Sequence, residues 1–336
     1  MAGDRYSPLS TPSATREVLE RHGLYTKYGL GQNFLVSDDV IRKILELANV
    51  QPGDRVLEVG PGIGTLTAAL LPRVAHVVAI EKDADLPAVL DDTLEPWADR
   101  FTLVAGDALN ISREGVAVIG GAPTQGDHGS AASASCVEGE RGVVQPSRQE
   151  ERPGCEARGL GRNGSDNLPN KLVSNLPYAV AATVVLDYLQ RFDFLESMTV
   201  MVQKEVADRM TARPGTKAYG AYTVKLSLFA QPAGRFAVAP GNFFPPPHVE
   251  SAVLRLDRIE APAHASAICT MADAAFATRR KTIANSCKTY FSCSPEMQEA
   301  LPSVFEVADI DPRRRGESLT REEFIRLGNA FSSVRQ

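Results

Sequence analysis

A strand, a glycine-rich turn and a helix follow one another over residues 55–67, and this stretch constrains the fold most. Residues 55–59 are apolar enough to predict a short buried strand, and residues 65–71 predict the start of an apolar helix. Between them, glycines stand at alternate positions: Gly60, Gly62 and Gly64. Glycine accepts positive φ, and it lets the backbone approach a nucleoside-type ligand that a Cβ atom would block. The stretch therefore predicts a ligand-binding turn in an α/β fold.

Carboxylates follow at the ends of the next two predicted strands. Residues 77–81 predict a strand that ends in Glu81, 21 positions after Gly60. An acid at about this distance binds ribose hydroxyls in nucleotide-binding folds. Residues 101–105 predict a third strand, and Asp107 follows it. Because parallel strands end at the same edge of a sheet, we expect both acids to lie near the glycine turn.

The glycine spacing distinguishes two classes of nucleotide-binding protein. The dinucleotide fingerprint places two residues between its last two glycines, whereas a single residue separates Gly62 from Gly64. Glu58 also lies inside the strand. This pattern resembles the first motif of methyltransferases that use S-adenosyl-L-methionine (SAM), and it disfavours a nicotinamide dehydrogenase. For the motif taken alone, a tight turn without a ligand is the alternative.

Composition excludes several classes of protein. The 336 residues are 43% apolar and 23% charged, which is ordinary for a globular protein of about two domains. No apolar run is long enough for a membrane span and no signal pattern opens the chain, so we expect a cytoplasmic protein without a membrane partner. The five cysteines show no zinc spacing, so we predict no metal and no disulfide framework.

The order of patterns predicts a tail, two domains and an insertion. Residues 1–14 are rich in Ser, Pro and Thr, and we expect a disordered tail. Alternating strands and helices over 15–258 predict a seven-stranded, mostly parallel sheet, and only helical patterns follow over 259–336. Residues 219–231 predict a helix. Residues 112–170 lack any hydrophobic period and predict a low-complexity insertion, mobile and dispensable.

A second motif, Asn175-Leu176-Pro177-Tyr178, follows the predicted strand 171–174. A nucleobase amino group is a poor nucleophile because its lone pair is delocalised. Two acceptors that hold both N–H groups push the nitrogen toward sp³, and an Asn oxygen with the adjacent main-chain carbonyl supplies them. Proline holds this turn, and tyrosine offers a face for the base. Catalysis would then be positioning and electrostatics. The alternative is a plain turn.

Motif blocks in this order resemble the ribosomal RNA small-subunit adenine N6,N6-dimethyltransferase family. The blocks are residues 27–36, 58–64, Glu81, Gly106 with Asp107, 175–178, 243–253, 279–282 and 315–319. The resemblance implies an α/β, Rossmann-like SAM-dependent methyltransferase fold with a small all-α C-terminal domain. It implies an RNA-binding enzyme that dimethylates two adjacent adenosines in the 3′-terminal hairpin loop of 16S rRNA. It also implies action on the 30S subunit late in ribosome biogenesis, and we expect a monomer.

The resemblance implies roles for single residues. Asn33 and Leu35 would border the methionine end of SAM, and Gly60 would pass under it. Glu81 would bind the ribose hydroxyls and Asp107 the adenine amino group. The catalytic residues would be Asn175, Leu176, Pro177, Tyr178 and Phe243, with Asn175 also touching the cofactor and with Tyr178 and Phe243 enclosing the target adenine. Phosphate contacts would come from Lys204, Arg209, Arg213, Arg279, Arg280 and Lys281.

Three departures and two rivals remain open. The span from Asp107 to Asn175 covers 68 positions, far more than in relatives, His248 stands where the family often has lysine, and Gly316 replaces a usual alanine, which we take as minor. One rival is a macrolide-resistance methyltransferase acting on 23S rRNA, which the block at 279–282 disfavours. The other is a non-catalytic ribosome-assembly factor that binds RNA, which the intact Asn175 disfavours.

Overall fold

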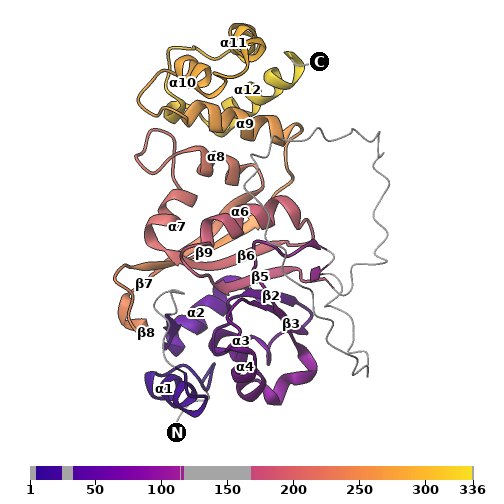
Figure 1. Ribbon diagram of the computed structural model, residues 1–336, viewed down its shortest axis with the longest axis vertical. Coiled ribbons are helices and arrows are strands. Elements are labelled where there is room, and N and C mark those ends of the chain that lie inside the picture. The colour runs from indigo at the N-terminus through magenta and orange to yellow at the C-terminus, as the bar shows by residue number, and fades with distance from the viewer. Residues whose placement is uncertain (1–4, 25–32, 114, 117–167, 335–336) are drawn as a thin grey trace, which may run out of the picture.

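The computed structural model describes residues 5–24, 33–113, 115–116 and 168–334 (Figure 1). Most of the predicted insertion at 112–170 lies outside the described residues, as do the first four residues of the predicted tail and most of the block at 27–36.

A seven-stranded sheet forms the centre of the protein, with strand order β4-β3-β2-β5-β6-β9-β7. Five neighbouring strands are parallel, and β9 runs antiparallel to both β6 and β7. The predicted mostly parallel sheet is confirmed. Its strands are β2 (Arg55–Val59), β3 (His76–Glu81), β4 (Phe101–Ala105), β5 (Lys171–Asn175), β6 (Ser197–Gln203), β7 (Ala230–Val238) and β9 (Ser251–Arg258). A separate pair, β1 (Phe34–Leu35) and β8 (Phe243–Phe244), is antiparallel.

Helices cover both faces of the sheet, which explains the nearly continuous apolar sequence of the central strands. One core cluster contains Ile41, Ile44 and Leu66 from α2 and α3, and another contains Val184 and Tyr188 from α6. The helices are α2 (Asp38–Ala48), α3 (Thr65–Leu70), α4 (Pro87–Thr93), α6 (Ala181–Arg191), α7 (Lys204–Met210) and α8 (Ala221–Ser227), with a short η2 (Glu95–Arg100).

The predicted disorder of the N-terminal tail is wrong for residues 5–14. Helix α1 (Pro12–Arg21) already begins at Pro12, and Ser7 and Ser10 are buried. The Asp38 carboxylate accepts hydrogen bonds from the backbone N–H groups of Tyr6 and Ser7, both at 3.1 Å. These contacts with a distant residue order a segment whose composition alone resembles a disordered tail.

The predicted helix at 219–231 is partly wrong, because α8 ends at Ser227 and β7 begins at Ala230. β7 contains Pro232 and Gly234, which obscured its strand pattern. It is an edge strand, where a proline on the open side needs no ladder hydrogen bond, and its register shifts between these two residues.

Four helices form a layer beyond α8, at the top of Figure 1. They are α9 (Ala265–Phe276), α10 (Ile283–Tyr290), α11 (Pro295–Val307) and α12 (Arg321–Val334), with a short η4 (Gly316–Ser318) before the last. η4 lies very close to α9, since a Cβ atom on Gly316 would stand 2.7 Å from the Ala275 carbonyl oxygen. The glycine at 316 is therefore a packing requirement in this chain and not a minor change.

Candidate active site

The carboxyl ends of β2 and β5 separate at the centre of the sheet. These neighbours are paired at Val56 with Lys171 and at Leu57 with Leu172. Further on, the Ser174 side chain bridges the strands: Oγ accepts the Val59 N–H at 3.3 Å and donates to the Val59 carbonyl at 2.6 Å. After β2 the chain continues to β3 on one side of this point, and after β5 it continues to β6 on the other side. Ligands bind where a parallel sheet reverses its strand order in this way.

The turn after β2 depends on its glycines. Gly60, Gly62 and Gly64 have φ values of +70°, +61° and +86°. A Cβ atom on Gly60 would stand 3.2 Å from the Pro177 ring, and one on Gly62 would stand 3.1 Å from the Phe34 ring. The turn therefore needs glycine both for its backbone conformation and for its close packing against the Asn175–Tyr178 motif and β1.

Two acids with different environments lie beneath this turn. Burial raises the pKa of Glu58 to about 8 against a 2.7 Å hydrogen bond from Thr67 Oγ1, and the charge of Glu81 adds to the rise. The Glu81 carboxylate accepts the backbone N–H groups of Lys82 and Asp83 at 2.9 Å and of Gly62 at 3.3 Å. Burial raises the pKa of Glu81, and these hydrogen bonds oppose the rise. Because its pKa is about 8, Glu58 is mostly protonated at neutral pH, whereas opposing effects act on Glu81.

Asp107 lies one strand away from Glu81, because the Gly106 N–H donates to the Glu81 carbonyl at 2.8 Å. Its carboxylate accepts from Lys82 Nζ at 2.8 Å and from the Leu109 N–H at 3.0 Å, and both lower the pKa of Asp107. The Lys82 side chain is 71% exposed, so a ligand amino group can replace its ammonium group on Asp107 at little cost. The two predicted acids therefore lie together, as expected.

Asn175 is the last residue of β5, and a hydrogen bond to Asn33 orients its carboxamide. Nδ2 donates to the main-chain carbonyl of Asn33 at 3.3 Å, which fixes the NH₂ end toward that acceptor and leaves Oδ1 as an acceptor for a ligand. The buried Leu176 donates its N–H to Met201 in β6 at 3.1 Å. The structure thus joins Asn175 to Asn33 and places Pro177, two residues later, against Gly60 of the glycine turn.

The two predicted base-stacking rings differ in exposure. Tyr178 is half-buried, and its hydroxyl lies 2.7 Å from Oγ of the buried Ser251 at the start of β9. Burial raises the pKa of Tyr178, so its hydroxyl stays protonated. Phe243 is only 3% exposed and is paired with Leu35 in the β1–β8 ribbon. The structure does not present Phe243 as an open face.

Several supporting residues were not predicted from sequence. Ser174 and Lys82 each make a polar contact at the site, yet they stand outside the recognised blocks. Ser251 lies within the block at 243–253, but the motif does not reveal its contact with Tyr178. Phe34 lies within the recognised block at 27–36, and its contact with Gly62 depends on the pairing of β1 with β8.

The basic residues of the predicted RNA contacts fall into two groups. Lys204 and Arg209 pair with the carboxylates of Glu250 and Glu205, respectively. The α7–α8 loop, with Arg213 and Lys217, adjoins the α9–α10 loop at 279–281. One bond joins these two loops, because Arg279 Nη2 donates to the Thr216 carbonyl at 3.2 Å. η4 holds both loops: the Gly215 N–H donates to the Glu317 carbonyl at 2.7 Å, and the Glu317 carboxylate pairs with Arg279 at 3.1 Å.

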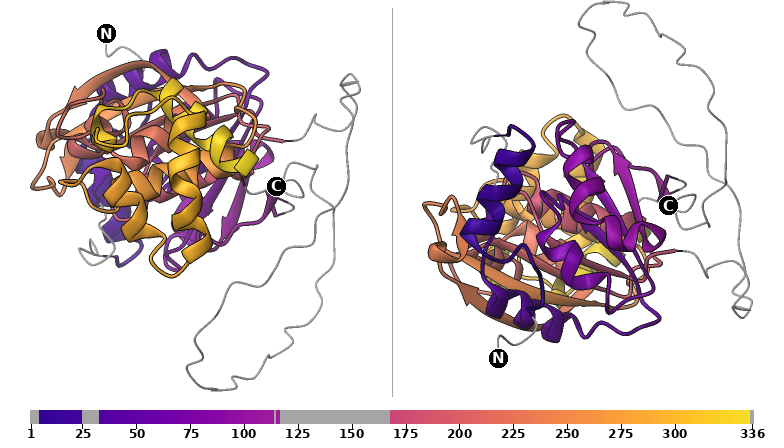
Figure 2. Two further views of the ribbon diagram at one scale, coloured as in Figure 1. Left: turned by 90° about the horizontal axis from the view of Figure 1, so that it is seen from above. Right: turned by 90° about the horizontal axis from the view of Figure 1, so that it is seen from below.

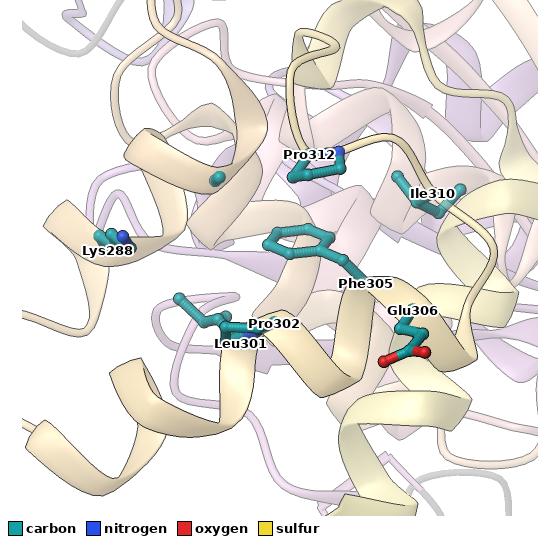
Figure 3. A pocket seen from close by; sticks show the side chains of 8 residues that line it. Lys288, Leu301, Pro302, Phe305, Glu306, Ile310 and Pro312 are labelled. Carbon is teal, nitrogen blue, oxygen red and sulfur yellow. The ribbon is translucent and has the colours of Figure 1, made fainter.

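A cavity of about 410 Å³ lies in the helical layer and is separate from this site (Figure 3). Leu301, Phe305 and Pro312 form much of its apolar lining. None of the predicted site residues lines it. Among the described residues, no helix is long and apolar enough to cross a membrane, and no group of three or more His, Cys, Asp or Glu side chains could hold a metal.

A family model described as ribosomal RNA adenine dimethylase matches residues 24–327. The chain belongs to the ribosomal RNA adenine dimethylase family. Ribosomal RNA small subunit methyltransferase A of Enterococcus faecalis is 36% identical over 330 residues, which cover 97% of both chains. The protein of that name from Geobacillus kaustophilus is 33% identical over 333 residues, which cover 98% of this chain and 99% of the relative. The family predicted from the motif blocks is confirmed.

Solved structures share the fold. A dimethyladenosine transferase from Plasmodium falciparum has a TM-score of 0.64 at 19% identity, covering 90% of this chain and 98% of its own. A 23S rRNA methyltransferase, ErmE, has a TM-score of 0.56 at 21% identity, and the match covers 89% of this chain and 100% of ErmE. At these identities the likeness concerns the fold alone, and it confirms the predicted Rossmann-like methyltransferase fold.

Proposed function

We propose that the protein transfers methyl groups from SAM to the N6 amino groups of two adjacent adenosines in the 3′-terminal hairpin loop of 16S rRNA, within the 30S subunit. The observation that carries the proposal is the Asn175 carboxamide, oriented by Asn33 at a strand end beside the glycine turn. The names of the relatives support the small-subunit substrate.

The chemistry of the strand ends fits SAM. The turn at Gly60 allows close backbone approach, Glu81 supplies acceptors for ribose hydroxyls, and Asp107 supplies one for the adenine amino group in place of Lys82. Asn33 and Leu35 would border the methionine end. When bound, SAM supplies an electrophilic methyl group on a sulfonium.

The protein's part in the reaction is to hold the target amine. Asn175 Oδ1 and a main-chain carbonyl of the same turn would accept the two N–H groups of the adenosine N6, which directs the nitrogen lone pair toward the methyl group. Leu176 and Pro177 keep this turn in place through the bond to Met201 and the contact with Gly60. Such fixed acceptors stabilise the transition state more than the ground state.

We assign the first stacking contact of the target adenine to Tyr178, whose hydroxyl is held by Ser251. Phe243 can stack on the base only after its buried ring becomes exposed, so its contact would follow the entry of the base. An adenosine that is flipped out of its loop offers its N6 and one face to this arrangement.

The adjoining basic loops would bind rRNA phosphates, with Arg213, Lys217 and residues 279–281 as contacts. We assign residues 5–258 to a methyltransferase domain that carries the insertion, and 259–334 to a helical domain that helps to dock the RNA. The proposal places a monomeric, metal-independent enzyme in the cytoplasm, acting in ribosome biogenesis.

The test is to incubate the protein and labelled SAM with 30S and 50S subunits and to locate the methylated bases by mass mapping. The proposal predicts dimethylated adenosines near the 3′ end of 16S rRNA. Label in 23S rRNA would instead support a macrolide-resistance enzyme. Binding to 30S subunits without transfer would support an assembly factor.

A further inference from the structure

Helix α1 is anchored to the elements that surround the candidate site. Its apolar residues Val18 and Leu19 belong to one core cluster with Ile63 of the glycine turn and Phe34 of β1, and Phe244 of β8 packs against this cluster. In the view from below in Figure 2, the indigo α1 lies beside the orange segment that includes β8. The helix is therefore a fixed part of the site's border.

Asp38 and Asp92 hold the two ends of this segment. Asp38 accepts the N–H groups before α1, and Asp92 accepts from Arg21 at 2.9 Å and lies 3.0 Å from a ring nitrogen of His22. Arg21 also pairs with Glu17, so its charge is matched by two carboxylates.

Arg16 differs from Arg21 although both lie on the same helix. Its guanidinium stands 5.3 Å from the centroid of the Phe244 ring. Among the described residues no carboxylate forms an ion pair with it, even though Glu20 follows one turn later. A guanidinium stacked on an aromatic ring keeps its in-plane N–H donors available for a bidentate acceptor such as phosphate.

We infer that Arg16 binds a phosphate of the RNA strand that carries the target adenosine. Phe244 holds the guanidinium at β8. The next residue back along this strand is Phe243, whose ring lies on the opposite face and which the proposed function places against the target base. A cation at this border would contact the backbone close to the base that enters the site. This inference rests on the proposed function and adds a contact outside the recognised motif blocks.

The test compares Arg16→Ala, Arg16→Lys and the matched control Arg21→Ala in binding to 30S subunits from 50 to 200 mM salt. Log affinity falls as log salt rises, and the loss of one phosphate contact makes this negative slope shallower by about 0.7 to 1. We expect this decrease for Arg16→Ala only. Arg16→Lys should keep the slope, because it keeps the charge. All variants should bind SAM with wild-type affinity by calorimetry.

An unchanged slope for Arg16→Ala would overturn the inference, as would a loss of SAM affinity, which would place Arg16 at the cofactor. Equal decreases for Arg16→Ala and Arg21→Ala would also overturn it, since they would report a general change of charge. Failure of the proposed function is a different result, because wild-type protein would then leave 16S rRNA unmethylated.

Discussion

Replacing Glu58 by glutamine should change how stability depends on pH. Glu58 is fully buried, and its pKa in the folded protein is about 8, compared with an ordinary value of 4.5. The folded state therefore holds a proton on Glu58 that the unfolded state releases between these values, so the contribution of Glu58 to wild-type stability falls as pH rises from about 4.5 to 8. Glutamine stays neutral throughout and can still accept the hydrogen bond from Thr67.

The magnitude follows from the two pKa values. At about 1.4 kcal/mol for each pH unit, the full difference corresponds to roughly 5 kcal/mol, an upper bound for a buried group. The free energy of unfolding of Glu58→Gln, relative to wild type, should therefore rise between pH 5 and pH 8 and level off above. Glu81 is present in both proteins, so its own titration largely cancels.

Urea unfolding at pH 5, 6, 7 and 8 measures this difference, with the m-value checked at each pH. The matched control is Glu205→Gln, whose side chain is 85% exposed, and its stability should run parallel to wild type. Parallel curves for Glu58→Gln as well would refute the reasoning, because they would show that Glu58 is ionised in the folded protein at neutral pH.

Three further predictions concern the cofactor, the helical layer and the insertion. Glu81→Ala should weaken SAM binding by about 1.5–3 kcal/mol in calorimetry, and unchanged affinity would exclude the ribose contact. Gly316→Ala should lower the free energy of unfolding by about 1–3 kcal/mol because of its contact with Ala275, whereas Gly53→Ala, with open space around it, should not. Replacing 117–167 by a short linker should preserve SAM binding and methyl transfer, and loss of transfer alone would make this segment a substrate-binding element.

Much of the fold could be predicted because its central strands are apolar and end in recognisable residues. The strands at 55–59, 77–81 and 101–105 agree with the structure within one residue. The start of α12 is also readable from the sequence, because Thr320 followed three residues later by Glu323 predicts a capping box. In the structure the Glu323 N–H donates to Thr320 Oγ1 at 3.3 Å, and the Thr320 N–H donates to the Glu323 carboxylate at 2.8 Å.

The errors arose where contacts distant in sequence override local pattern. Asp38 orders the segment before α1, and the sheet edge tolerates Pro232 in β7. At the site, the motifs predicted roles for the acids and Asn175, but they did not predict how the structure holds these side chains. Burial decides the protonation of Glu58 and the exposure of Phe243, and burial depends on packing that a single sequence does not display.

The measurement that tests the central claim most directly is single-turnover methyl transfer by Asn175→Ala, compared with its affinity for the same 30S subunits. Because Oδ1 is proposed to act on the target amine at the reacting centre, the rate should fall a hundredfold or more, a cost of roughly 3 kcal/mol. Affinity should stay near wild type, since phosphate contacts elsewhere supply it. If rate and affinity fall in parallel, or if neither changes, Asn175 does not position the amine and the account is contradicted.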